Sequence, residues 1–155
     1  MKANTRLFGE VDIPEEKIIT FDQGVLGFEE CKKFTIIYDT SKETDSTISW
    51  LQCMDEPELA FPMISPFYVM EDYNPIVETE WLEPLGEMTA ENIVIFVFLN
   101  IKSDVTRLTA NLKAPIIINP DTLKGIQLIV ENTDYGIKYN IYDVVQRMKT
   151  EKGDC

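Results

Sequence analysis

The sequence predicts an all-β protein, an antiparallel β-barrel-like single domain with only short helices. Short apolar runs alternate along the chain with Gly, Pro, Asn and Asp, which is the pattern of many short strands joined by turns. Residues with the spacing of a long amphipathic helix are scarce. The chain has 155 residues, of which 45% are apolar, and it contains no repeat or linker, so we expect one domain over residues 1–155.

Eleven segments have the apolar content and the flanking turn residues expected of strands. In chain order they are Thr5–Ile13, Lys17–Phe21, Phe34–Tyr38, Thr47–Cys53, Ala60–Ile64, Ile76–Trp81, Asn92–Ile101, Arg107–Leu112, Pro115–Asn119, Gln127–Glu131 and Ile137–Ile141. In the fourth segment, Ile48 and Trp50 share one face, which is the two-residue period of a half-buried strand. The seventh is almost wholly apolar, which predicts a central strand covered on both faces.

Two segments are candidates for helices. Val25–Phe34 follows Gly24 and fits a short helix or a turn. Tyr142–Lys149 has apolar residues on one stripe and cations near its C-terminal end, where they suit the helix dipole. We therefore expect one helix near the C-terminus, followed by a frayed tail over residues 150–155.

Paired glycines predict a tight turn at Gly24-Val25-Leu26-Gly27, because glycine accepts positive φ. The Lys-Ser/Thr ending of a phosphate-binding loop is missing here, and the following Glu29-Glu30 would repel phosphate. We expect the turn to bury Phe21 and Phe28. Four further aromatic residues are expected in the core: Trp50, Phe61, Phe96 and Phe98.

The segment Leu108–Asn119 reads LTANLKAPIIIN. Its polar insert, Thr109–Pro115, joins the apolar run Ile93–Leu99 to the apolar run Ile116–Ile118. Asn side chains bond nearby backbone groups, and Pro115 fixes its own φ while favouring extended geometry before it. We predict that Asn111 holds this insert by hydrogen bonds to the backbone. The alternative is a polar site that joins Asn111 and Lys113 to Asp55.

Several chemistries are excluded by composition. The chain has no His, so it has no His base, no Ser-His-Asp arrangement and no His-ligated metal. Its three cysteines, Cys31, Cys53 and Cys155, are widely spaced and odd in number, which argues against a zinc site or a disulfide framework. We expect Cys31 and Cys53 to be half-buried, and we expect no catalytic residue, metal or cofactor.

Charge is concentrated in the first part of the chain. Residues 1–100 carry 20 acidic and 6 basic side chains, a net charge of −14, whereas residues 101–155 carry 7 acidic and 8 basic ones, a net of +1. Such a surplus repels nucleic acid and attracts basic proteins. Improved solubility is the other interpretation. The paired carboxylates give no sign of an acid and a base with divergent pKa values, so we expect them to lie on the solvated surface.

No apolar run approaches the roughly 18 residues of a membrane-spanning helix, and the N-terminus lacks a signal-peptide pattern. We therefore expect a cytoplasmic protein that contacts neither membrane nor nucleic acid.

Five motifs occur together in a fixed order: TRLFG at Thr5–Gly9, FDQGVLGFE at Phe21–Glu29, WLQ at Trp50–Gln52, PELAF at Pro57–Phe61, and the insert described above. In this order they resemble the flagellar assembly factor FliW family, over Thr5–Tyr139. The motif residues that we expect to be structural are Phe8, Gly9, Phe21, Gly24, Gly27, Phe28, Trp50, Gln52, Phe61, Asn111, Lys113 and Pro115.

The resemblance implies a non-enzymatic function. FliW-family proteins bind CsrA, a small basic RNA-binding regulator that represses flagellin translation, and they also bind flagellin, which competes with CsrA. An acidic partner would lower the positive potential of CsrA and repel RNA. The carboxylates that we expect to contact partners are Asp55, Glu56, Glu58, Glu71 and Asp72.

Two other functions stay open from the residues alone. A closed β-barrel can hold one small molecule, although no polar groups are evidently reserved for its interior. A carboxylate-dependent hydrolase would need two of the acidic side chains in one cleft.

Overall fold

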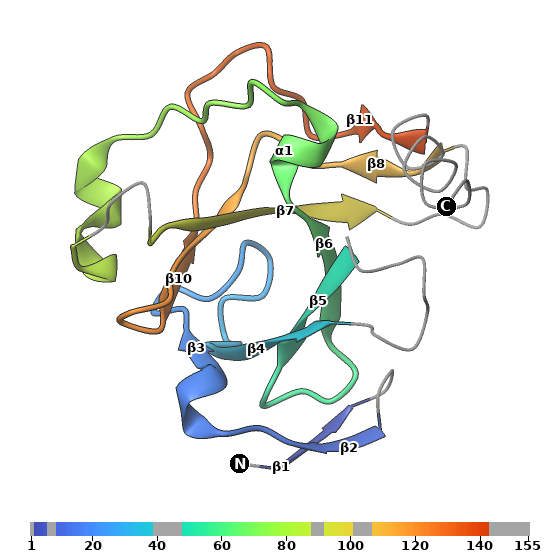
Figure 1. The fold of residues 1–155 in the computed structure, drawn as a ribbon, viewed down its shortest axis with the longest axis vertical. Coiled ribbons are helices and arrows are strands. Elements are labelled where there is room, and N and C mark those ends of the chain that lie inside the picture. Colours follow the sequence, from blue (N-terminus) through green and yellow to red (C-terminus); the bar gives the residue numbers. More distant parts are fainter. Residues whose placement is uncertain (1, 6–8, 39–47, 88–91, 101–106, 143–155) are drawn as a thin grey trace, which may run out of the picture.

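Seven strands form a closed barrel in this computed structural model, which describes residues 2–5, 9–38, 48–87, 92–100 and 107–142 (Figure 1). Their order around the barrel is β3, β4, β5, β6, β7, β9 and β10, and β10 pairs with β3 to complete the ring. The strands are β3 (Ile18–Thr20), β4 (Lys33–Tyr38), β5 (Ile48–Cys53), β6 (Ala60–Ile64), β7 (Val94–Asn100), β9 (Ile116–Asn119) and β10 (Lys124–Gln127).

Neighbouring strands of the barrel run antiparallel, except for β10 and β3, which pair in parallel through Lys124 and Thr20. Parity explains the exception, since an odd number of strands in a ring cannot alternate in direction at every step. The backbone N–H of Thr20 donates to the carbonyl of Leu123 at 2.8 Å across this junction. The predicted fold, a mainly antiparallel β-barrel with short helices, is therefore confirmed.

Four short strands lie outside the ring. β8 (Thr109–Ala110) pairs with β7, and β11 (Tyr139–Asn140) pairs with β8. β1 (Lys2–Thr5) and β2 (Gly9–Asp12) form a separate antiparallel hairpin, so the single strand predicted over Thr5–Ile13 is wrong. Gly9 has a φ of 69° where β2 begins, a conformation that interrupts a continuous strand. Phe8 lies outside the described residues.

The helices within the described ranges are short: α1 (Pro66–Val69) and the 3₁₀-helices η1 (Glu15–Lys17) and η2 (Thr79–Leu85). The strand predicted over Ile76–Trp81 is wrong, because η2 begins at Thr79. Residues four apart would share one face of a strand. Trp81 is 53% exposed and Leu85 is buried, so this segment does not have the side-chain pattern of a strand. The Val25–Phe34 segment forms a turn up to residue 32, with a bridge between Val25 and Phe28, and its last two residues begin β4. The helix predicted at Tyr142–Lys149 lies outside the described residues from position 143 on.

Strand boundaries were predicted less well than strand positions. β6 agrees with its predicted range. The strand predicted over Gln127–Glu131 is wrong, because β10 spans Lys124–Gln127 and shares only Gln127 with it. The strands predicted over Arg107–Leu112 and Ile137–Ile141 are too long, because the observed strands β8 and β11 have two residues each. These segments pack their buried side chains against the outside of the barrel, so their apolar content comes from this cover rather than from a long strand.

Apolar side chains fill the interior of the barrel. Phe21 and Phe34 lie edge to face with ring centroids 5.2 Å apart, and Phe61 stacks on Phe98 at 4.8 Å. Their neighbours in this cluster include Ile19, Leu51, Cys53, Met63, Ile116 and Ile118. A filled interior is typical of small barrels.

Two further apolar clusters cover the outside of the barrel. In one, Ile64 and Val97 pack under the segment that contains Tyr73, whose ring stacks on Tyr135 at 4.7 Å. In the other, Leu85 of η2 packs on Ile117 and neighbouring residues of β9 and β10. β7 contributes alternate side chains to the interior and to these outer clusters. The prediction that this strand is covered on both faces is thus confirmed.

Gly125 in β10 makes room for the buried ring of Phe21. A Cβ at this position would lie 2.6 Å from the Phe21 ring, well inside van der Waals contact. We expect Gly125→Ala to lower the free energy of unfolding by about 1–3 kcal/mol through overpacking, as measured by urea denaturation. Gly136→Ala is the control, because a Cβ there meets nothing within 4 Å.

The Gly125 account also predicts coupling. Phe21→Leu combined with Gly125→Ala should cost less than the sum of the two single substitutions, since the smaller side chain relieves the clash. If the losses in unfolding free energy of the two single substitutions simply add in the double variant, the ring of Phe21 is not the reason that position 125 requires glycine.

Candidate functional site

Two loops form one end of the barrel. The first, residues 21–32, joins β3 to β4, and the second, residues 54–59, joins β5 to β6. Because these strand pairs are antiparallel and adjacent, both loops emerge at the same end. This end therefore collects residues that lie far apart in the sequence.

Glycine determines the shape of the first loop. Gly24 and Gly27 have φ values of 67° and 87°, which L-residues rarely adopt. A Cβ on Gly24 would lie 2.6 Å from the backbone of Glu29, so the turn is also too tight for a side chain there. The backbone N–H of Leu26 donates to Oε1 of Gln127 at 2.9 Å, which attaches the turn to β10. The predicted tight reversal is confirmed.

The aromatic residues of the motifs divide between the core and the surface. Phe21 is fully buried, as predicted, but Phe28 is 44% exposed, so its predicted burial is wrong. The turn projects Phe28 at the end of the barrel, where it packs edge-on against Phe61 at 5.2 Å and otherwise faces solvent. Phe61, Phe96 and Phe98 pack partly buried against the interior cluster. Trp50 is only half-buried, because its neighbour Leu51 takes the inward face of β5.

A buried amide holds the second loop. Nε2 of Gln52 lies 3.0 Å from the carbonyl oxygen of Cys53 and 3.2–3.4 Å from those of Glu56, Pro57 and Leu59. Gln52 is completely buried, and its Oε1 has no hydrogen-bond partner. Because the loop turns its carbonyl groups inward toward this amide, the acidic side chains of the loop lie outside. Gln52 is thus structural, as expected.

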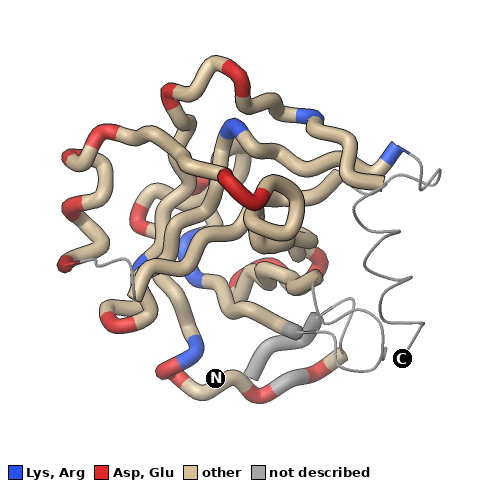
Figure 2. The backbone as a smooth tube through the Cα atoms, turned by 45° about the horizontal axis from the view of Figure 1, so that its top comes forward, with Lys and Arg blue, Asp and Glu red and all other residues tan. Residues whose placement is uncertain are grey.

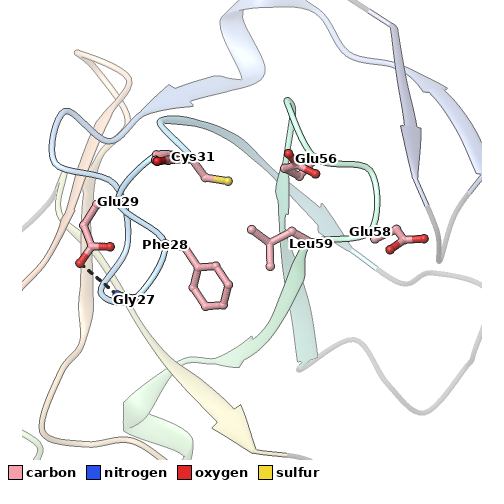
Figure 3. Close-up of a pocket in the computed structure, with 8 residues that line it drawn as sticks. Gly27, Phe28, Glu29, Cys31, Glu56, Glu58 and Leu59 are labelled. Carbon is pink, nitrogen blue, oxygen red and sulfur yellow. Dashed lines mark hydrogen bonds between the residues drawn. The ribbon is translucent and has the colours of Figure 1, made fainter.

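A groove lies between the two loops, with a volume of about 480 Å³ (Figure 3). We call it the acidic groove, and its lining side chains are Phe28, Glu29, Glu30, Cys31, Glu56, Glu58 and Leu59. Glu29 also accepts a hydrogen bond from the backbone N–H of Gly27 at 3.3 Å. All four glutamates are exposed. A concave surface with an apolar floor and charged edges is the usual form of a binding site.

The acidic groove brings together only part of the predicted partner-binding set. Glu56 and Glu58 line it, and Asp55 lies exposed on the same loop. Glu71 and Asp72 are exposed beyond α1 and do not line the groove. The pair Glu29-Glu30 was not predicted as part of the site. Its position beside the glycine turn was visible in the sequence, but its proximity to the other loop was not.

Acidic residues are also spread over the rest of the molecule, with fewer basic residues among them (Figure 2). Asp22 forms an ion pair with Lys124 at 3.2 Å, with both side chains about half exposed. An exposed pair of this kind contributes at most about 1 kcal/mol to stability. The four carboxylates of the groove are distinguished by their arrangement around an apolar floor rather than by their number.

Cys31 lies at the base of the acidic groove next to Cys53. Both are buried and free, so the prediction that they are half-buried is wrong. Burial, the adjacent Cys53 thiol and the carboxylates of the second loop raise the pKa of the Cys31 thiol to about 12. The thiol is therefore protonated at neutral pH and is a poor nucleophile.

The polar insert has the predicted arrangement. Oδ1 of Asn111 accepts hydrogen bonds from the backbone N–H groups of Lys113 and Ala114, at 3.1 and 3.2 Å. Nζ of Lys113 donates to the carbonyl oxygen of Asn132 at 2.7 Å, and Pro115 is buried. Both motif residues thus bond to the insert and its neighbouring loop. The alternative site with Asp55 does not form, since Asp55 lies on the second loop of the barrel end.

A second hollow, of about 290 Å³, opens at the opposite end of the barrel between interior residues such as Ile36, Val94 and Ile118. It carries one acidic and one basic residue among its lining side chains, Glu16 and Lys17. Within the described ranges no group of three or more His, Cys, Asp or Glu side chains is placed to hold a metal ion. Over the same ranges no helix is long and apolar enough to cross a membrane.

Fold and site together define a small closed β-barrel protein with an acid-lined groove at one end. The FliW protein family model matches residues 2–141, and the chain belongs to this family. The flagellar assembly factor FliW of Lachnoclostridium phytofermentans is 49% identical over 156 residues, with 100% of both chains covered. That of Lachnospira eligens is 49% identical over 148 residues, which cover 95% of this chain and 98% of the relative.

A solved structure has the same fold. The crystal structure of the flagellar assembly factor FliW superimposes with a TM-score of 0.83 and is 33% identical in sequence. The match covers 91% of this chain and 96% of the other. The family expected from the motifs is thereby confirmed.

Asn111 should contribute measurably to stability. Asn111→Ala would leave the backbone N–H groups of Lys113 and Ala114 without their acceptor in a half-buried site. We expect a loss of roughly 1–3 kcal/mol in the free energy of unfolding, and Asn111→Asp, which keeps the acceptor oxygen, should lose less. An unchanged melting temperature for Asn111→Ala would contradict the structural role.

Gln52 should determine the order of the second loop. Gln52→Met keeps the length of the side chain but removes the donor, so the carbonyl oxygen of Pro57 loses its hydrogen bond to the amide. The carbonyl oxygens of Glu56 and Leu59 also lose the amide and keep only their backbone N–H donors. We expect about 1–3 kcal/mol of destabilisation and faster amide exchange over residues 54–59. The exposed Gln23 provides the control, Gln23→Met. Equal exchange rates in both variants would show that the amide does not hold the loop.

Proposed function

We propose that this protein is a non-enzymatic flagellar assembly factor of the cytoplasm, which binds CsrA and relieves its repression of flagellin mRNA. Flagellin is the competing partner. The observation that carries the proposal is the match over the whole chain, at 49% identity, to a protein named flagellar assembly factor FliW. The two partners follow from the resemblance to that family.

Charge supplies a physical mechanism for the antagonism. CsrA must present basic groups to the phosphates of RNA, and this chain has a formal net charge of −13. The exposed carboxylates Asp55, Glu56 and Glu58 lie on one ordered loop, beside Glu29 and Glu30. Docked near a basic surface, they would lower its positive potential and repel incoming phosphates without covering the residues that read the bases.

Competition between partners would couple translation to assembly. When flagellin is scarce, the protein is free to bind CsrA, and flagellin mRNA is translated. When flagellin accumulates, it occupies the protein and releases CsrA to repress translation. This scheme requires only reversible binding at an exposed surface, such as the acidic groove and its carboxylates.

The two alternatives have less support. A small-molecule-binding barrel needs an interior space with polar groups that orient the ligand. Here apolar side chains pack the interior, and the hollow of about 290 Å³ that opens into it is lined mainly by apolar residues. A carboxylate-dependent hydrolase needs two carboxyl groups in different environments, which raise the pKa of one relative to the other. The four glutamates of the acidic groove are all exposed, so burial does not distinguish an acid from a base among them.

Binding to CsrA should depend steeply on salt. Exposed charges are screened over about 10 Å at 0.1 M salt, so the association rate should fall as the ionic strength rises. The triple variant Asp55→Asn, Glu56→Gln, Glu58→Gln should weaken binding mainly through a slower association rate. Flagellin binding should depend less on salt if it uses apolar contacts. Stopped-flow or biosensor titration against the cognate CsrA measures these rates.

A matched variant separates local from overall charge. Glu80→Gln, Glu83→Gln, Glu87→Gln removes the same number of negative charges from η2 and the residues after it, all of them exposed. It should change the association rate less than the loop variant does. If CsrA does not bind at any salt concentration, the proposed partner is wrong. Tight binding that is indifferent to salt would retain the partner and reject the electrostatic mechanism.

A further inference from the structure

The acidic groove has an apolar floor beneath its charged edges. Phe28 and Leu59 face each other across it, and Leu26 on the same turn as Phe28 is 49% exposed (Figure 3). These apolar side chains remain in contact with water. The barrel interior begins directly behind Phe28, whose ring packs against that of Phe61. Exposed apolar surface enclosed by polar residues is typical of a site for another molecule.

The charge of the groove has one sign. Glutamates stand on both walls, Glu29 and Glu30 on the first loop and Glu56 and Glu58 on the second, and none of the lining residues is Lys or Arg. The pKa of the Cys31 thiol is raised first by burial, then by the contact with Cys53, and then by the carboxylates of the second loop. The negative field of these carboxylates therefore extends to the floor of the groove. A complementary ligand must therefore carry positive charge on both sides of an apolar group.

Both walls are fixed before any ligand arrives. On one side, positive φ at Gly24 and the bond from Leu26 to Gln127 set the turn. On the other, Gln52 holds the backbone of residues 56–59. A preformed site of this kind loses little conformational entropy on binding.

We propose that the acidic groove receives a basic amphipathic segment of a partner protein. One apolar side chain of the segment lies on Phe28 and Leu59, and Lys or Arg side chains to either side pair with the glutamates of the two walls. This inference rests on the proposed function and deepens it, because it states where a partner binds and which chemistry is recognised.

A polypeptide satisfies the groove better than a small ligand does. A volume of about 480 Å³ has room for a few side chains. A free polyamine would neutralise the glutamates but leave the rings and chains of Phe28 and Leu26 in water. An apolar molecule would leave the carboxylates unpaired in a drier environment, which is costly. Only a segment with alternating apolar and basic groups complements both features.

The direct test uses a fluorescent amphipathic helical peptide of Leu and Lys, titrated by anisotropy and mapped by amide chemical shifts. We expect shifts at Gly27, Phe28 and residues 56–59. Phe28→Ala should weaken binding roughly tenfold, as expected for a central apolar contact. Phe67→Ala is the matched control, since Phe67 is 48% exposed and also packs edge-on against one ring, that of Tyr73. It should bind as the wild type does.

A charge-reversal pair tests the walls without touching the core. Glu30→Lys, Glu58→Lys should weaken peptide binding roughly tenfold or more, and Glu80→Lys, Glu83→Lys on η2, with the same change in net charge, should have a much smaller effect. All four positions are exposed, so both variants should fold. Equal losses in both would overturn the groove as the site. Displacement of the peptide by spermidine, with the same shifts at equal occupancy, would overturn the polypeptide as occupant.

Titration of CsrA and flagellin against the same variants separates this inference from the proposed function. If neither partner binds the wild type while the peptide maps to the groove, the proposed function fails and the groove stands. The opposite outcome is that a partner binds all three proteins equally well: the wild type, the Phe28→Ala variant and the Glu30→Lys, Glu58→Lys variant. In that case the groove assignment fails and the proposed function stands.

Discussion

The packing of Phe21 against Gly125 is the contact on which the rest of the structure depends. It lies where β3 meets β10, the parallel junction that completes the ring. A backbone bond from Thr20 to Leu123 supports the same junction. The ring of Phe21 is completely buried, and the residues that follow it form the first loop of the acidic groove. The contact thus links closure of the barrel to the start of the first loop of the groove.

The two loops reach their shapes by different physical means. The first is determined by backbone conformation, since Gly24 has a positive φ and no space for a side chain. The second is determined by one buried side chain, Gln52, whose amide gathers the carbonyl groups of the loop. Motif residues that never touch a partner can therefore decide where the acidic residues lie.

Much of the fold could be predicted from the sequence, because strand periodicity and turn residues are local signals. The strand containing Trp50 and the polar insert around Asn111 were both predicted on such signals. The segment Ile76–Trp81 is wrongly predicted as a strand, since Ile76 and Trp81 are exposed. The apolar residues of η2 that pack against the barrel are Leu82 and Leu85, at the end of this 3₁₀-helix. The groove itself was not predictable, because it joins Glu30 to Glu58 through barrel closure, and no local pattern records that proximity.

The central claim is that the barrel end formed by residues 21–32 and 54–59 is the surface that meets a protein partner. Hydrogen–deuterium exchange of the protein, free and bound to its cognate CsrA, tests it most directly. The account predicts that binding slows exchange in both loops together and leaves η2 unchanged. Protection confined to η2, or to the β8 and β11 edge, with both loops exchanging as in the free protein, would contradict it.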